Sequence, residues 1–165
     1  MIGKLKIKKM YPLLLVVVIA RIIAFLCSYY TGAKGEFFHS VELVKSDFVA
    51  KLILAIIVIV ISIVSIGIVY LFSELLLFIS KEILQIEIQF EKIFIAYAIF
   101  MIVTAIQPIF RNWSLFSLSF LNPISVLGTL IFGVLLYHFS KNKVLAVSLS
   151  ICVCFSIHII NILQL

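Results

Sequence analysis

Charged residues are scarce in this chain, and their scarcity excludes a water-soluble fold. Asp, Glu, Lys and Arg make up 12% of the 165 residues, whereas hydrophobic residues make up 65%. A soluble domain is about a quarter charged and about half apolar. A fold of this size also has too little interior to bury so much apolar surface. The composition therefore predicts an integral membrane protein, with the lipid bilayer as its first partner.

Residues that carry catalytic or metal-binding chemistry are few and widely separated. The three histidines lie in three different regions, which does not fit the ligand spacing of a zinc site. No serine lies in a nucleophile-elbow motif, and no two carboxylates face each other on one predicted helix. The lysines flank apolar runs instead of forming a basic face with interleaved aromatics, so nucleic acid is not an expected partner. The sequence predicts a protein that is not an enzyme, with no catalytic residue, metal or cofactor.

Long apolar runs are what the chain has in abundance. Runs of about 20 residues are typical of membrane-spanning helices, whereas the strands of a membrane barrel are about 10 residues long and alternate. The sequence thus predicts one all-α transmembrane domain over residues 1–165. Its five expected spans cover residues 11–30, 52–79, 93–110, 123–139 and 144–165. Asn122 and Pro123 have the residue types of an N-cap and a first helical position for the fourth span.

The basic residues outside these spans predict how the chain crosses the membrane. Counted on alternating sides, eight lie on the side of the N-terminus: Lys4, Lys6, Lys8, Lys9, Lys81, Lys92, Lys141 and Lys143. Four lie on the other side: Lys34, Lys45, Lys51 and Arg111. Because basic residues accumulate on the cytoplasmic side, we expect a cytoplasmic N-terminus and an outside C-terminus. The heavy use of Ile, Phe and Lys favours a bacterial cytoplasmic membrane.

Arg21 is a charged residue midway along the first predicted span. A charge at that depth costs a few kcal/mol on insertion scales. We therefore expect Arg21 to point into the bundle, either tied to carbonyls or a carboxylate for structure, or in contact with an ion, lipid headgroup or substrate. Ser62, Ser65 and Thr104 are the other polar side chains that an intramembrane site could use. A small permease or substrate-binding component would need such a polar site.

A second candidate site is the stretch Leu84–Glu91, in which apolar and polar residues alternate strictly. This is the period of an extended strand and not of a helix. One interpretation is an edge with which a partner protein pairs, using Glu87, Glu91 and Phe90 as contacts. The other is a connector that rests its apolar side chains on the membrane surface. In both, the apolar row faces the bilayer edge or a partner.

Three groups of residues in the second half of the chain have the order of features found in a known family. They are Gln89-Phe90-Glu91-Lys92-Ile93 followed by Ala96-Tyr97-Ala98 and Gln107-Pro108, then Leu121-Asn122-Pro123-Ile124-Ser125, then Gly133 followed by Phe139-Ser140-Lys141-Asn142-Lys143. They resemble the phenylalanine-led loop and helix, the fourth-helix entry and the hairpin of the Yip-domain (Ypt/Rab-interacting protein) membrane family, bacterial type.

The resemblance implies a function as well as a fold. Bacterial relatives in this family are implied to be accessory membrane proteins, some of them acting beside ABC-type exporters in peptide-toxin export or self-protection. We therefore expect a non-enzymatic accessory protein that associates with another membrane complex, and the resemblance implies an ABC-type transporter as that partner. The alternative is the small permease with a polar site near Arg21.

Overall fold

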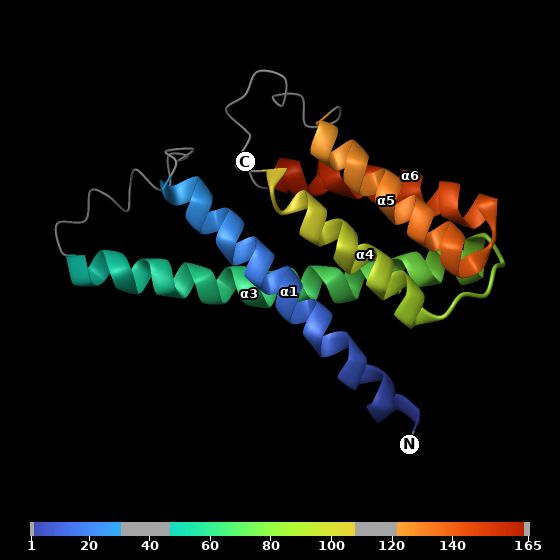
Figure 1. Cartoon of the computed structure of the whole chain (residues 1–165), viewed down its shortest axis with the longest axis horizontal. Helices are drawn as coiled ribbons and strands as arrows, with labels where there is room; N and C mark the ends of the chain where they lie inside the picture. The colour runs from blue at the N-terminus through green and yellow to red at the C-terminus, as the bar shows by residue number, and fades with distance from the viewer. Residues whose placement is uncertain (1, 31–46, 108–121, 164–165) are drawn as a thin grey trace.

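The computed structural model describes the backbone of residues 2–30, 47–107 and 122–163, and the side-chain surroundings of residues 10–27, 48–107 and 122–155. All regular structure in these ranges is helical (Figure 1). The elements are α1 (Ile2–Tyr30), α3 (Asp47–Phe78), the π-helix η1 (Ile79–Ile83), α4 (Phe90–Thr104), α5 (Pro123–Ser140) and α6 (Lys143–Leu163). Three stretches are long and apolar enough to cross a membrane, namely Met10–Cys27, Phe48–Ile83 and Pro123–Ser140. The predicted all-α class is thereby confirmed.

The helices and the predicted spans differ mainly at their ends. The first helix begins at Ile2, well before the expected start at residue 11, and α3 begins at Asp47 instead of residue 52. Hydropathy marks where lipid contact begins, whereas lysine-containing flanks are good helix formers and continue the helix into water. The helix expected over residues 93–110 begins at Phe90 and ends at Thr104, and residues 108–110 lie outside the described ranges.

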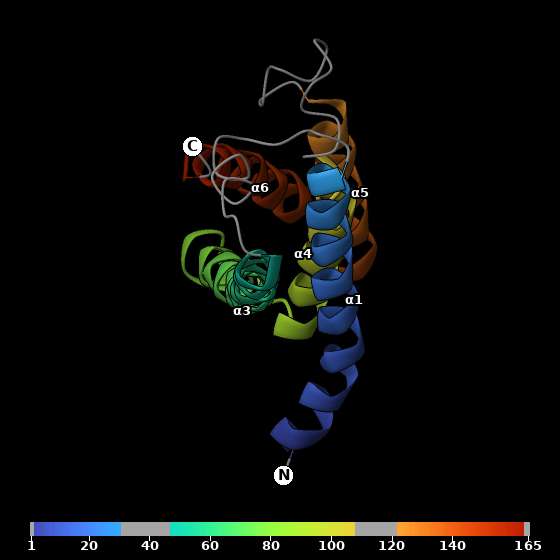
Figure 2. The ribbon, with the colours of Figure 1, turned by 90° about the vertical axis from the view of Figure 1, so that its left-hand side faces the viewer.

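The α4 helix is central, because it packs against α1, α3 and α5, while α5 packs also against α6. Figure 2 shows α1, α4 and α5 on one side of the molecule and α3 and α6 on the other. The loop after η1 and the turn between α5 and α6 lie at the same end of the molecule, on the right of Figure 1. The start of α3 lies at the opposite end. This arrangement places polar connections at one end of an apolar bundle.

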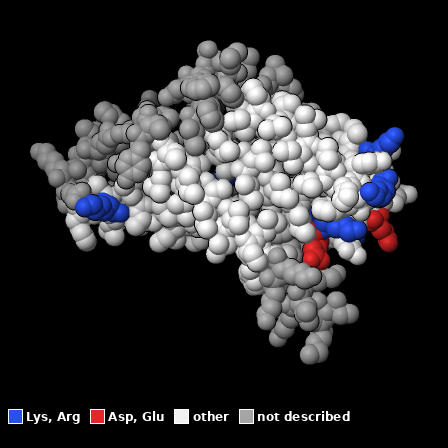
Figure 3. Space-filling view, viewed as in Figure 1, with Lys and Arg blue, Asp and Glu red and all other residues white. Residues whose placement is uncertain are grey.

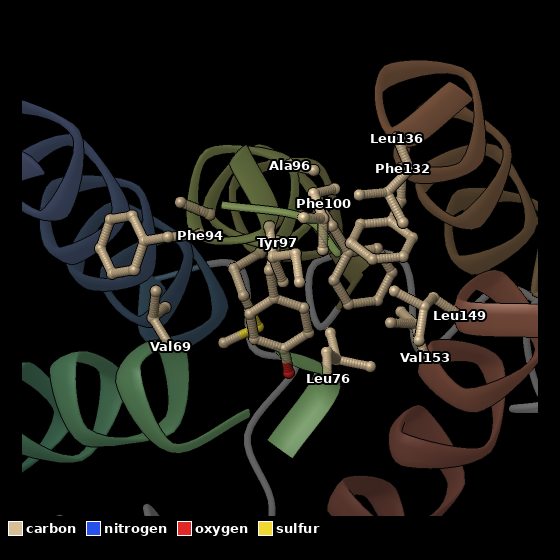
Figure 4. Close-up of a cluster of buried hydrophobic side chains, with 14 of the residues drawn as sticks. Val69, Leu76, Phe94, Ala96, Tyr97, Phe100, Phe132, Leu136, Leu149 and Val153 are labelled. Carbon is tan, nitrogen blue, oxygen red and sulfur yellow. The ribbon is translucent and has the colours of Figure 1, made fainter. Parts of the chain in front are cut away.

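Aromatic rings fill the core around α4. Tyr97 is fully buried at the centre of the cluster in Figure 4, with side chains from α3, α5 and α6 around it. Its ring stacks on Phe72 of α3 at a centroid distance of 5.7 Å and meets Phe132 of α5 edge-on at 6.4 Å. Offset and edge-on ring pairs add about 0.5–1.5 kcal/mol each beyond burial. Tyr97 therefore ties α4 to helices on both of its sides.

The α5 helix approaches its neighbours closely at two glycines. A Cβ atom on Gly128 would lie 3.1 Å from Thr104 Cγ2 and 3.2 Å from a Phe100 ring carbon of α4. A Cβ atom on Gly133 would lie 2.7 Å from Ser150 Oγ of α6. Small residues allow membrane helices to pack backbone to backbone. Each glycine thus serves a different helix interface.

Both ends of α5 have polar caps. The Asn122 side-chain oxygen accepts a hydrogen bond from the Ile124 amide at 2.9 Å, and Pro123 is the first helical residue, so both predictions for this helix start are confirmed. At the other end Lys141 adopts a left-handed conformation with φ 56°, and its amide donates to the Tyr137 carbonyl at 2.8 Å. Asn142 Oδ1 then accepts from the Leu145 amide and begins α6. The predicted turn is a tight helical hairpin.

Candidate functional site

The segment after η1 is held in place by a reciprocal pair of hydrogen bonds. The Ile86 amide donates to the Ser80 carbonyl at 2.9 Å, and the Ser80 hydroxyl donates to the Ile86 carbonyl at 2.6 Å. Ser80 is fully buried, so the Ser80 side of both bonds is shielded from water. Gln85 adopts a left-handed conformation, with φ 55°, where the chain turns. The alternation predicted an extended strand over Leu84–Glu91, whereas residues 85–89 carry no regular secondary structure and Phe90 and Glu91 belong to α4.

The alternation in this segment sorts the side chains into two rows. Gln85, Glu87 and Gln89 are exposed, and we call these three residues the polar ridge. The opposite row packs inward, with Ile88 only 8% exposed and part of the core. We expected the apolar row on the bilayer edge or on a partner, but in the structure it rests on the core of its own chain. The reason is that η1 and α6 meet here, a contact between segments distant in the sequence.

The three predicted partner contacts lie in different surroundings. Glu87 stands exposed in the polar ridge. Phe90 is half-buried and meets Tyr70 of α3 edge-on at a centroid distance of 5.6 Å. Glu91 is half-buried in the first turn of α4, where a carboxylate complements the helix dipole. The structure therefore leaves Glu87 as the residue most open to a partner.

Basic side chains lie at the same end of the molecule as the polar ridge. Lys81 on η1 is exposed, as are Lys141 and Lys143 at the α5–α6 turn. The Lys92 ammonium donates to the Phe139 carbonyl at 3.2 Å, near the C-terminal end of α5, where a cation is favoured by the helix dipole. Figure 3 shows acidic and basic side chains gathered at this end of the molecule, next to a largely uncharged face. The polar ridge thus belongs to the charged end of the bundle.

Arg21 lies against α4, inside the apolar part of the bundle. One terminal nitrogen, Nη2, donates to the Met101 sulfur at 3.5 Å, and Tyr97 of α4 lies near the guanidinium. Its Nε is buried and has no hydrogen-bond partner among the residues that the structure describes. We expected a carbonyl, hydroxyl or carboxylate as partner, and the structure provides a thioether. The sequence did not connect Tyr97 or Met101 with Arg21, because apolar and aromatic residues within a span give no signal of such a contact.

The hydroxyls predicted to accompany Arg21 are directed elsewhere. Ser62 donates to the Val58 carbonyl at 2.7 Å, and Thr104 donates to the Phe100 carbonyl at 3.0 Å, each within its own helix. Ser65 is 5% exposed. Over the described part of the chain, no hydrogen bond joins any of the three to Arg21. The predicted polar site therefore reduces to the guanidinium and its two neighbours on α4.

Comparisons with models of known protein families, with curated proteins and with solved structures find no match. The resemblance to the Yip-domain family therefore rests on the sequence motifs alone and stays a prediction. Across residues 2–30, 47–107 and 122–163, no group of three or more His, Cys, Asp or Glu residues is placed to hold a metal ion. The polar ridge and Arg21 remain as the two candidate sites.

Proposed function

We propose that this chain is a non-enzymatic accessory protein of the bacterial cytoplasmic membrane that associates with another membrane complex. The partner that the family resemblance implies is an ABC-type exporter for peptide export or toxin self-protection. The observation that carries the proposal is the polar ridge, a solvent-facing row fixed to the core at the charged end of the bundle.

The polar ridge is organised before any partner arrives. The Ser80–Ile86 hydrogen bonds and the buried Ile88 hold the segment from behind. A segment that is already ordered loses little conformational entropy when it binds. The exposed side chains of Gln85, Glu87 and Gln89 can give a partner specificity. Glu87 adds a carboxylate that attracts basic groups of a partner.

The proposed topology has five spans with the N-terminus in the cytoplasm. Three stretches of spanning length support it, as does the packing of α4 in the middle of the bundle and of α6 beside α5. Lys81, Lys141 and Lys143 lie on segments at the same end of the molecule, which agrees with the positive-inside rule. In this topology the polar ridge faces the cytoplasm, where the nucleotide-binding parts of an exporter would also lie.

The permease alternative has less support. A transporter site needs several polar groups that converge at mid-depth. Here Ser62 and Thr104 donate to carbonyls of their own helices, which is the usual way for a buried hydroxyl to be satisfied within a membrane helix. Arg21 alone does not make a substrate site of that kind.

Charge reversal on the polar ridge tests the proposal. Glu87→Lys should reduce the amount of the membrane partner that co-purifies in mild detergent by at least about tenfold, since truncating or reversing a charged contact costs about 1.4 kcal/mol or more. The matched control is Glu82→Lys, the same change at an exposed position on η1 that lies outside the ridge. Quantitative mass spectrometry of the purified material provides the measurement. Equal recovery of every partner with wild type and Glu87→Lys would contradict the proposal.

A further inference from the structure

Glu74 is a carboxylate on the outer surface of α3, inside an apolar stretch. It lies within Phe48–Ile83, nine residues before the end of that stretch, or about 14 Å along the helix at about 1.5 Å per residue. Phe72, two residues earlier, stacks on the buried Tyr97, so this turn of α3 lies against the core of the bundle. The Glu74 side chain is exposed, and within the described part of the chain it has no hydrogen bond or ion pair.

The side of α3 that carries Glu74 is suited to contact with protein. Acidic residues within membrane-spanning helices are costly, and they almost always face the interior of a bundle or pair with another group. Ser73 and Leu76 of the same turn are buried in the bundle of their own chain, whereas Glu74 points away from it. Figure 2 shows α3 at the edge of the molecule, with the other helices to one side of it. We therefore expect a further helix to cover this face of α3.

The outer face of α3 has the spacing with which two parallel helices pack. Residues along its middle recur at alternating intervals of four and three, which is the seam of a two-stranded pair of helices. We call them the α3 seam: Ile56, Val60, Ile63, Gly67, Tyr70 and Glu74. The four apolar and aromatic members besides Gly67 are all more than half exposed, and nothing lies within 4 Å of a Cβ on Gly67. The seam is thus open along its length, with one ionisable residue in it.

We propose that two copies of this chain pair through their α3 seams, so that the two Glu74 carboxyls meet within the membrane. Copies of one chain have the same orientation in the membrane, so their α3 helices run parallel and each seam residue meets its counterpart across a two-fold axis. A carboxyl that carries a proton donates a hydrogen bond that the other accepts, so a second Glu74 is a sufficient partner. A polar residue at a single seam position also fixes the register of such a pair. This inference goes beyond the proposed accessory function and does not depend on the polar ridge.

Energy transfer between two labelled populations of the full-length chain tests the inference. The chains are reconstituted in phosphatidylcholine vesicles, and the transfer should fall as they are diluted in lipid. Glu74→Leu should weaken association about tenfold, or by about 1.4 kcal/mol, because it removes a hydrogen bond between the helices. Glu74→Gln should retain association, since an amide both donates and accepts. The matched control is Glu82→Leu, which removes an exposed carboxylate outside the α3 seam and should associate as wild type does.

Disulfide cross-linking tests the geometry in chains that retain Glu74. In a cysteine-free background, Ile56→Cys and Ile63→Cys place single thiols on the α3 seam, where each should cross-link to the same position of a second copy. Val64→Cys and Leu75→Cys place thiols beside the seam, at positions that are 49% and 50% exposed. These two should cross-link much more slowly, because a disulfide needs Cα atoms within about 7 Å of each other. The comparison is independent of any effect of Glu74 variants on folding.

Several results would overturn the inference. Wild type that stays monomeric at every dilution, Glu74→Leu that associates as wild type does, or equal cross-linking at positions 63 and 64 would each show that the α3 seam is not an interface between copies. If wild type is monomeric and Glu74→Leu loses a membrane protein that co-purifies with wild type, the carboxyl binds a different protein and the inference is wrong as well.

Discussion

Gly128 and Gly67 lie in helices of similar apolar character, but only Gly128 meets another helix. The Cβ of any larger residue at position 128 would press on Thr104 and Phe100 of α4, whereas nothing lies within 4 Å of a Cβ at position 67. The sequence does not separate the two glycines, because each lies within a predicted apolar span. Their difference arises from helix packing, which is a property of the fold.

Replacing each glycine by leucine should therefore affect stability at position 128 but not at position 67. Gly128→Leu should lower the free energy of unfolding by about 1–3 kcal/mol, since over-packing forces side chains and backbone to shift. Gly67→Leu should cause no loss, because its side chain enters open space. Thermal unfolding in detergent, followed by circular dichroism, measures both variants. Equal destabilisation by the two substitutions would mean that α4 and α5 do not approach each other as described.

Arg21 shows how far sequence reasoning extends at a single residue. Its position midway along an apolar run predicted that it would point into the bundle, and it lies against α4. Its neighbours could not be predicted, because Met101 lies eighty positions away in the chain and carries no polar pattern. The sequence shows that a charge needs a partner, while only three-dimensional packing shows which atoms are near it.

At the level of elements, the connection from η1 to α4 determines the shape of the candidate docking surface. Alternation along Leu84–Glu91 predicted two rows of side chains, and the exposed and buried residues follow it as far as Phe90. It did not predict that the apolar row packs on the protein's own core, since that depends on η1 meeting α6. Nor did it single out Ser80, because an isolated serine at the end of an apolar helix has no distinctive pattern.

Ser80→Ala should loosen the polar ridge. The substitution leaves the partly buried Ile86 carbonyl without the hydroxyl donor, which costs about 1–3 kcal/mol. Hydrogen exchange of the amides in residues 84–89 should become faster. The control is Ser62→Ala, whose hydroxyl donates to a carbonyl of its own helix, so that its loss should change stability by no more than about 0.5 kcal/mol. Unchanged exchange in Ser80→Ala would show that the ridge is held by its apolar row alone.

At the level of the whole molecule, composition predicted the helical membrane fold, and apolar runs predicted where most helices lie. Helix ends were less predictable, because α1 and α3 continue into polar flanks. The centrality of α4 was not predictable either. It depends on Tyr97 and its aromatic neighbours, which resemble ordinary lipid-facing residues in the sequence. In the structure the charged side chains gather at one end of the molecule, so its two ends differ. The proposed function depends on which of them faces the cytoplasm.

Cysteine accessibility tests this orientation most directly. In a background with Cys27, Cys152 and Cys154 replaced by alanine, single cysteines are introduced by Asn142→Cys, Glu87→Cys and Ser114→Cys. Positions 142 and 87 should react with an impermeant maleimide only after the membrane is permeabilised, and position 114 should react in intact cells, because the basic residues hold the charged end in the cytoplasm. Labelling of positions 142 and 87 in intact cells, with position 114 protected, would contradict the account.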